Sequence, residues 1–208
     1  MASRTVDGGA ALEWGVAAVP MAGETSNGDL HLVVDVPGGA LVAALDALGH
    51  GPEAARTAER AVVALISRPT DPIPEILRRC HQALIGSRGV VVSLATFDTR
   101  AGVMTWAGIG NVEGVLIRNG EHRPSTRSGL INLGGIVGAE LPEIRAQQLP
   151  VEPGDVLVFA TDGIRRDFID QIDPHRPPAE MARELLMRHA KGSDDALILV
   201  VRYRGPPP

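Results

Sequence analysis

The chain has 208 residues, of which 44% are hydrophobic and 22% charged, and its formal net charge is -5. This length and apolar content predict a single domain over residues 1–208 with one substantial core. The last residues of this range, from about 205 to 208, are expected to form a disordered tail. Acidic and basic residues are interspersed without the basic stripe that a phosphate backbone requires, which excludes nucleic acid as a partner. The sequence shows no signal-peptide pattern and no run of about 18 uncharged apolar residues, so we expect a cytoplasmic protein that does not bind membranes.

Two residue types that each occur once in the chain limit the catalytic mechanisms available to it. Lys191 is the only lysine, and its context, HAKGSDD, is not a glycine-rich phosphate loop, so P-loop, kinase and Schiff-base mechanisms are excluded. Cys80 is the only cysteine and shares a helical spacing with the apolar residues around it, which predicts a core position. Catalysis must therefore come from acids, histidines, hydroxyl groups or metal ions.

In the first half of the chain, two apolar runs at 30–36 and 40–46 flank Pro37-Gly38-Gly39 and predict a β-hairpin. A helix is expected from Pro52, with its apolar stripe in residues 54–68. A second helix is expected from about residue 74 to 85, ending at Gly86.

The second half is richer in strands. These are predicted at 90–97, 103–110, 112–118, 143–149, 156–161 and 196–203, with a hairpin turn at Asn119-Gly120, a glycine-rich loop at 128–142 and a helix at about 178–190. Because strands and helices are grouped by type, and the strands are joined mostly by hairpins, the fold class predicted is α+β with antiparallel sheet.

Three aspartates lie at the ends of these strands: Asp46, Asp162 and Asp194. In antiparallel neighbours, the end of one strand and the start of the next lie at the same sheet edge, so the three can converge. The position of a fourth acid, Asp29, follows from the pairing register of the first hairpin. With a two-residue turn at Pro37-Gly38, partner numbers sum to 75 and Asp29 faces Asp46; with a three-residue turn the two are one position out of register.

Carboxylates held this close repel one another, and a cation would relieve that repulsion. A donor set of aspartates and backbone carbonyls suits Mg²⁺ or Mn²⁺, and no cysteine or histidine pair has the spacing of a structural zinc site. Two such ions about 3.5–4 Å apart can activate water for attack on a phosphoryl group, so phosphate ester hydrolysis is the chemistry that this pattern favours.

Other interpretations of the same residues remain open. Aspartate beside glycine at a strand end is ordinary turn chemistry, and Asp162-Gly163 can simply cap a helix that begins with IRRDF. The segment Gly49–Ala54 fits the dinucleotide fingerprint G-x-G-x-x-A, which would indicate an oxidoreductase. Against this, the acid expected about 20 residues later falls at Asp71, where no second strand has ended.

Five segments carry a resemblance to a known family: SNGD (26–29), LDALGHG (45–51), GIGNVEG (108–114), FATDGI (159–164) and SDDALILVV (193–201). Together they resemble the metal-dependent type 2C (PPM) protein serine/threonine phosphatases, and in particular the bacterial branch of stage II sporulation protein E and the stand-alone stressosome phosphatase. The resemblance implies a sandwich of two antiparallel β-sheets flanked by α-helices, with two metal ions at one end.

The resemblance also implies roles for single residues. Asp46 would bridge the two ions, the Ala47 carbonyl would complete the contacts of the first, and Asp162 and Asp194 would hold the second. Asp29 would lie behind these ligands and orient the water bound to the ions. Gly163, Asp195 and His50 are expected near the site, whereas the residues that bind the substrate are not identified.

Four departures from the family pattern are visible. Ala47 replaces the usual glycine, and Leu48 stands where the eukaryotic enzymes have histidine, which leaves His50 as a candidate proton donor or a surface histidine. Asn111 replaces an aspartate that many relatives use for a third metal. No arginine lies between Arg4 and Arg56, so the early strands offer none to clamp the phosphate.

The activity implied is hydrolysis of phosphoserine or phosphothreonine, with phosphorylated STAS-domain proteins of the stressosome, or anti-sigma-factor antagonists, as substrates and partners. Two Mn²⁺ or Mg²⁺ ions would be the cofactors. The alternative from the binding class is a phosphatase-like adaptor that holds metal without turnover.

Overall fold

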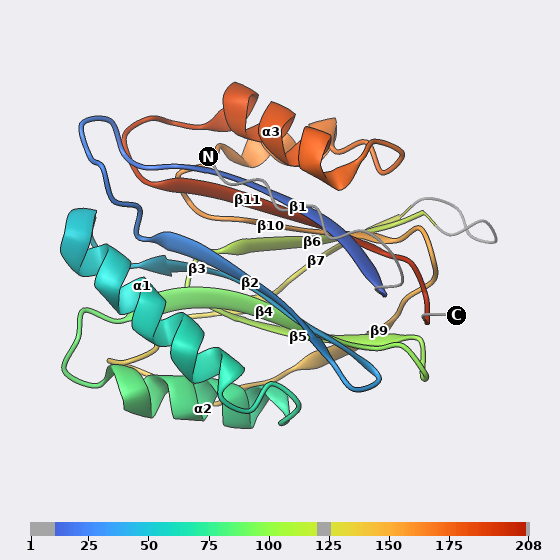
Figure 1. The fold of residues 1–208 in the computed structure, drawn as a ribbon, viewed down its shortest axis with the longest axis horizontal. Coiled ribbons are helices and arrows are strands. Elements are labelled where there is room, and N and C mark those ends of the chain that lie inside the picture. The colour runs from blue at the N-terminus through green and yellow to red at the C-terminus, as the bar shows by residue number, and fades with distance from the viewer. Residues whose placement is uncertain (1–10, 120–125, 207–208) are drawn as a thin grey trace.

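The structure, a computed structural model, describes residues 11–119 and 126–206 and consists of two β-sheets packed face to face (Figure 1). The first sheet has the order β1-β11-β10-β6-β7, with β1 at Leu12–Val19, β11 at Ala196–Tyr203, β10 at Val156–Ala160, β6 at Glu113–Arg118 and β7 at Thr126–Gly129. The second has the order β2-β3-β4-β5-β8, with β2 at Asp29–Val36, β3 at Gly39–Ala47, β4 at Val90–Asp98, β5 at Val103–Ile109 and β8 at Asn132–Leu133; β9 at Gln147–Pro150 also pairs with β5.

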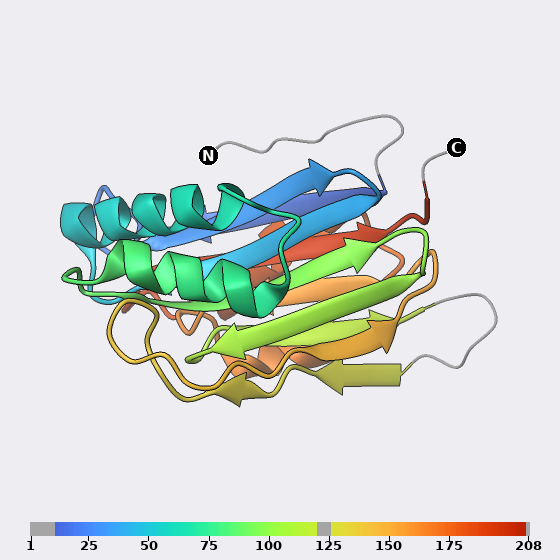
Figure 2. The same cartoon turned by 90° about the horizontal axis from the view of Figure 1, so that it is seen from below.

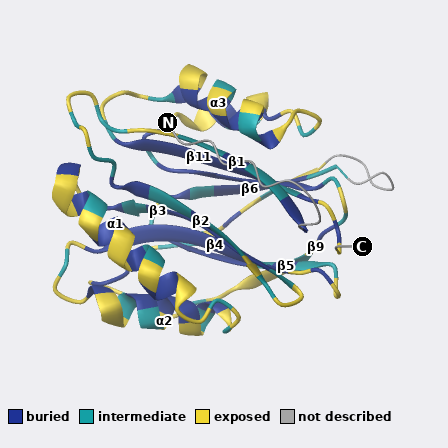
Figure 3. Ribbon diagram, in the orientation of Figure 1, coloured by how far each residue is buried: buried dark blue, intermediate teal, exposed yellow. Residues whose placement is uncertain are grey.

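Helices cover the outer face of each sheet (Figures 1 and 2). Helices α1 (Gly51–Ile66) and α2 (Ile73–Leu84) lie on the second sheet, while α3 (Pro178–His189) and the 3₁₀ helix η1 (Arg166–Gln171) lie on the first. The apolar residues accordingly form three layers, one between the sheets and one beneath each set of helices, and the buried faces of the helices turn inward (Figure 3). The predicted α+β sandwich is confirmed.

Cys80 belongs to the layer between α1, α2 and the second sheet and is fully buried. Burial raises the pKa of its thiol to about 12, which keeps it un-ionised at neutral pH. The predicted role as a core residue is confirmed.

The β2–β3 hairpin turns on two residues, Pro37 and Gly38, and Val36 pairs with Gly39. Gly38 has a φ of 80°, in the left-handed region that favours glycine. Partner numbers along the hairpin therefore sum to 75, and Asp29 faces Asp46. The register calculated for a two-residue turn is confirmed.

Several expectations about elements need correction. Strand β1 was not expected. It is an edge strand whose partner, β11, lies far away in the sequence, so no adjacent turn and second strand indicate it. Arg118 pairs with Thr126, so β6 and β7 are joined by residues 119–125 and not by a two-residue turn at Asn119-Gly120, of which Gly120 lies outside the described residues. The strand expected at 143–149 begins only at Gln147, and the loop at 128–142 contains β8. Of the predicted tail, residues 207–208 lie outside the described residues.

The dinucleotide-binding alternative is wrong. Helix α1 does follow β3, but α2 comes next and β4 returns antiparallel to β3, so no βαβ unit forms at Gly49–Ala54. Among the described residues, no helix is long and apolar enough to cross a membrane.

Candidate metal centre

One end of the sandwich gathers the predicted acids. There β3 and β10 end and β2 and β11 begin, on the left in Figure 1. Asp29 opens β2 opposite Asp46 near the end of β3, Asp162 follows β10 by two residues, and Asp194 precedes β11 by two. The antiparallel arrangement thus brings four acids from distant parts of the sequence to the same sheet edges.

The pKa values show that these carboxylates interact. Burial, followed by the negative charges of Asp162, Asp194 and Asp195, raises the pKa of Asp46 to about 7. Burial also raises the pKa of Asp29 to about 9, with further contributions in the same direction from Asp46, Asp195 and Asp162. The five aspartates therefore form one cluster, in which negative charge is costly unless a cation balances it.

Asp29 is fixed by a hydroxyl group that sequence analysis missed. The Thr161 hydroxyl donates to Asp29 Oδ2 at 2.6 Å and accepts the Leu197 N–H at 2.8 Å. Asp29, Thr161 and Leu197 are all buried. Thr161 thus ties the start of β2 to β10 and β11 across the two sheets, a relationship that no local pattern in the sequence signals.

Asp162 is held by contacts to its side chain and to its backbone. Asn111 Nδ2 donates to Asp162 Oδ2 at 2.8 Å, and Lys191 Nζ donates to the Asp162 carbonyl. The next residue, Gly163, packs so closely that a β-carbon on it would lie 1.9 Å from the Asp195 carbonyl oxygen. Only glycine permits this approach, which places Asp162 beside the segment that carries Asp194.

The interpretation of Asp162-Gly163 as a helix cap is wrong. The helical turn that follows, η1, begins at Arg166, and Arg165 occupies the position before it. Asp162 instead points toward Asn111 on the loop after β5.

Asp195 holds a loop. Its two carboxylate oxygens accept the backbone N–H groups of Met21 at 2.8 Å and Gly28 at 2.7 Å, at the two ends of the segment between β1 and β2. Gly28 in turn accepts the Ala47 N–H at 3.2 Å. The buried Asp195 carboxylate therefore sets the position of the backbone next to Asp29 and Ala47.

His50 lies at the rim of the same end, in the turn between β3 and α1. Its Nδ1 is 2.8 Å from Glu24 Oε1, and its side chain is 54% exposed. Arg88, which precedes β4, reaches the first turn of α1, where its Nη2 donates to Glu53 Oε2 at 2.6 Å. A histidine–carboxylate pair and an arginine–carboxylate pair thus border the cluster.

Within residues 11–119 and 126–206, no three histidine, cysteine, aspartate or glutamate side chains already form a group that could hold a metal ion. The donor chemistry nevertheless fits a hard divalent cation. The available groups are carboxylates and a carbonyl. Burial, and then repulsion between the carboxylates, raise the pKa values of Asp29 and Asp46, and a bound cation would offset the cost of their negative charge. Ala47 is fully buried, and its carbonyl oxygen faces Gly28, 3.4 Å from where a β-carbon on that glycine would lie.

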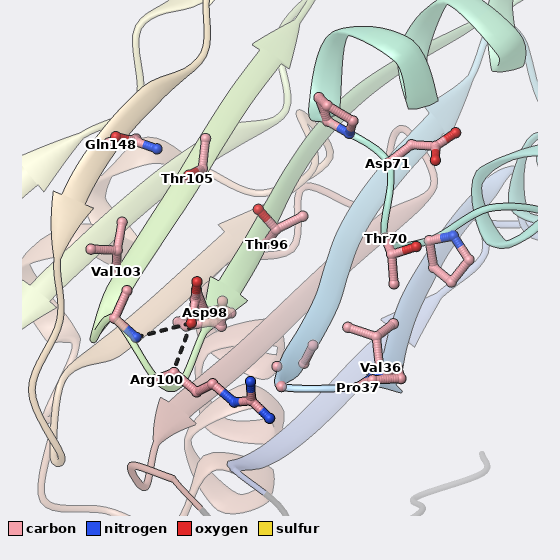
Figure 4. A pocket seen from close by; sticks show the side chains of 17 residues that line it. Val36, Pro37, Thr70, Asp71, Thr96, Asp98, Arg100, Val103, Thr105 and Gln148 are labelled. Carbon is pink, nitrogen blue, oxygen red and sulfur yellow. Dashed lines mark hydrogen bonds between the residues drawn. The ribbon is translucent and has the colours of Figure 1, made fainter.

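A groove of about 860 Å³ lies at the other end of the second sheet (Figure 4). It is lined by the Pro37-Gly38 turn, by residues 69–72 between α1 and α2, and by side chains such as Thr96, Thr105 and Arg100. Since β3 runs from Gly39 at this groove to Asp46, seven residues further on, the two lie about 23 Å apart. The groove is separate from the aspartate cluster.

The family is settled by a match to the family model described as stage II sporulation protein E (SpoIIE), which covers residues 37–204. The chain belongs to this family. The match contains Asp46, Asp162 and Asp194, whereas Asp29 lies before it. The resemblance inferred from the five sequence motifs is confirmed.

Individual members and structures agree with this placement. Phosphoserine phosphatase RsbX of Bacillus subtilis is 23% identical over 158 residues, 74% of this chain and 76% of RsbX. The crystal structure of RsbX in complex with magnesium superimposes with a TM-score of 0.84 at 17% identity, over 97% of this chain and 100% of that one. A chain from the structure described as "The bacterial stressosome: a modular system that has been adapted to control secondary messenger signaling" has a TM-score of 0.83 at 28% identity, over 92% of this chain and 99% of that one.

Proposed function

We propose that this member of the SpoIIE family is a protein serine/threonine phosphatase that uses divalent metal ions to hydrolyse phosphoserine or phosphothreonine. One observation carries the proposal: the antiparallel strands bring Asp46, Asp162 and Asp194 to one end of the sandwich, although 116 residues separate Asp46 from Asp162 in the sequence. Burial, and then the charges of Asp162 and Asp194, raise the pKa of Asp46 there. Carboxylates clustered at the edge of a buried core are energetically unfavourable unless a cation balances their charge, which indicates that the cluster binds one. Family membership and the likeness to phosphoserine phosphatase RsbX support the enzyme class.

In this proposal, the carboxylates of Asp46, Asp162 and Asp194 and the carbonyl of Ala47 would hold the ions. When bound, Mn²⁺ or Mg²⁺ would lower the pKa of a water molecule and neutralise charge on the phosphoryl oxygens. The magnesium complex of RsbX supports a divalent ion.

The protein's own groups position these ligands and the water. Asn111 fixes the orientation of the Asp162 carboxylate through a 2.8 Å hydrogen bond, and Asp195 holds the backbone that presents Ala47. Asp29, which the Thr161 hydroxyl holds in place, would orient the attacking water by a hydrogen bond. His50 is a candidate donor of the proton that the leaving serine or threonine oxygen requires, with Glu24 holding its Nδ1.

The substrates we propose are phosphorylated STAS-domain proteins of the stressosome or anti-sigma-factor antagonists. The support is the likeness to RsbX and to a chain of the bacterial stressosome structure. This choice concerns the partner and is independent of the proposed hydrolysis.

The experiment that tests the proposed activity is phosphate release from a phosphorylated STAS-domain protein, with Mn²⁺, with Mg²⁺ and with a chelator. We expect release that depends on the ion and is lost in Asp46→Asn. Ion binding without any release, from this substrate and from a small phosphate ester, would instead indicate the adaptor.

A further inference from the structure

Hydrolysis of a phosphoprotein poses an electrostatic problem at this site. A phosphoserine or phosphothreonine carries a charge of about -1.5 to -2 at pH 7, and it must approach five aspartates. Divalent ions offset part of this repulsion, but a side-chain cation free to contact the phosphoryl group would also favour binding. The sequence provides no arginine or lysine between residues 5 and 55, so apart from Arg4 such a cation comes from a later segment.

Three arginines that reach this end of the sandwich are already paired with carboxylates. Arg88 binds Glu53 at 2.6 Å, Arg166 lies 3.3 Å from Glu113, and Arg165 lies 3.8 Å from Asp167. A phosphoryl group would have to compete with these carboxylates for each guanidinium.

Lys191 differs from these arginines. Its ammonium donates to a neutral group, the Asp162 carbonyl, and in the part of the chain that the structure describes it has no carboxylate partner. An ammonium has three N–H donors, so two remain after this bond. Lys191 is exposed, which leaves those donors accessible to a substrate.

The backbone holds Lys191 beside the segment of one proposed metal ligand, Asp162, and a short distance along the chain from another, Asp194. The Lys191 N–H donates to the Gly163 carbonyl at 2.9 Å, so Lys191 is fixed beside the residue that follows Asp162. Along the chain it precedes Asp194 by three residues. The neighbouring bridge between Ile164 and Ala190, with the hydrogen bond from Arg165 N–H to the His189 carbonyl, holds the two segments in this register.

We propose that Lys191 is a substrate-binding residue whose ammonium contacts the phosphoryl group at the aspartate cluster. This rests on the proposed function, because it assumes that the cluster is where a phosphate monoester binds. It gives a role to the chain's only lysine, which has none in the proposed binding of the metal ions.

The first test is steady-state kinetics of Lys191→Met on a phosphopeptide with Mn²⁺. Loss of a charge-assisted hydrogen bond predicts a KM raised about tenfold and an inhibition constant for inorganic phosphate raised by the same factor, with kcat changed much less. Lys191→Arg keeps the charge and should recover most of the loss. Arg60→Met is the matched control, because Arg60 is also an exposed cation that donates to a carbonyl, that of Ala83, and it lies on α1 away from the cluster.

The second test does not require turnover. Because Lys191 is the only lysine, an amine-selective acylating reagent labels its side chain alone apart from the N-terminus, and peptide mass spectrometry separates the two. Inorganic phosphate with Mn²⁺ should slow labelling of Lys191 and leave labelling of the N-terminus unchanged.

The outcomes separate this inference from the proposed function. Wild-type turnover with an unchanged KM in Lys191→Met, and labelling that phosphate does not slow, would overturn the role of Lys191 and leave the phosphatase intact. If the wild type hydrolyses no phosphoester, the proposed function fails, while phosphate protection of Lys191 still decides whether this residue binds phosphate.

Discussion

Asp29 and Asp46 face each other across the β2–β3 ladder, and neither has a cationic partner among the residues that the structure describes. Burial and the charge of Asp46 raise the pKa of Asp29 to about 9, whereas burial and the charges of Asp162, Asp194 and Asp195 raise that of Asp46 to about 7. Two acids directly opposite on neighbouring strands destabilise a hairpin, so this pair is a local conflict of the kind found at functional sites.

The Asp29 pKa predicts how the stability of the metal-free protein depends on pH. Its folded value of about 9 lies above its unfolded value of about 3.9, so its contribution is fully present below about pH 4. It is lost as the pH rises through about 9. With a chelator present, the free energy of unfolding should therefore fall toward alkaline pH. Urea titrations between pH 5 and pH 9 measure this slope.

Asp29→Asn provides the control for this pH dependence. The amide has no charge to bury, so the slope should become smaller and the variant should be more stable than the wild type at pH 8.5 without metal. If wild type and variant show the same slope, the Asp29 carboxyl is not the group responsible.

The link between Thr161 and Asp29 predicts a difference between two substitutions. Thr161→Val removes the hydroxyl and leaves Asp29 Oδ2 and the Leu197 N–H without a buried partner, which should cost about 1–3 kcal/mol of stability and lower kcat. Thr161→Ser keeps the hydroxyl and should retain most of the activity. Equal losses in the two variants would show that the methyl group matters and the hydrogen bond does not.

Much of this arrangement could be predicted from the sequence, and the reason is geometric. The turn at Pro37-Gly38 fixes the register of the hairpin, so the Asp29–Asp46 pair follows by arithmetic. The strand-end positions of Asp162 and Asp194 likewise follow from apolar runs that stop at an acid. Their roles as metal ligands, like those of Asp46 and the Ala47 carbonyl, stay predictions. The expectation that Gly163, Asp195 and His50 act near the metal site also stays a prediction.

What could not be predicted depends on contacts between distant segments. Strand β1 pairs with β11, near the opposite end of the chain, so no turn next to β1 in the sequence signals the pairing. Gly15 of β1 also packs against Ala179 of α3, another distant segment. The contacts of Thr161 with Asp29, of Asn111 with Asp162 and of Asp195 with Gly28 all join separate elements. Residue types and spacing do not specify such pairs.

Gly163 should be sensitive to the smallest substitution. A β-carbon there would lie 1.9 Å from the Asp195 carbonyl oxygen, so Gly163→Ala must shift backbone at a cost of about 1–3 kcal/mol. The shift separates Asp162 from Asp194, so Mn²⁺ affinity measured by calorimetry should also fall. Gly134→Ala is the control, since a β-carbon there meets no atom within 4 Å and no positive φ is involved. Equal behaviour of the two variants would contradict the proposed close packing.

Asp194 and Asp195 are adjacent but should respond differently to replacement by asparagine. Asp195→Asn loses one of two acceptors for the Met21 and Gly28 N–H groups, so it should lower metal-free stability and speed proteolysis of the 21–28 segment. Asp194→Asn should weaken Mn²⁺ binding with little change in metal-free stability. Limited proteolysis and calorimetry on both variants compare the two effects, and a reversal would exchange the proposed roles.

The central claim is that Asp46, Asp162 and Asp194 share divalent ions. Anomalous diffraction from a crystal soaked in Mn²⁺ tests it most directly. We predict two anomalous peaks at the aspartate cluster, with Asp46 in contact with both, and none in a soaked Asp46→Asn crystal that keeps the same fold. A wild-type crystal with no peak at the cluster, or with Asp162 and Asp194 turned away from a peak at Asp46, would contradict the account.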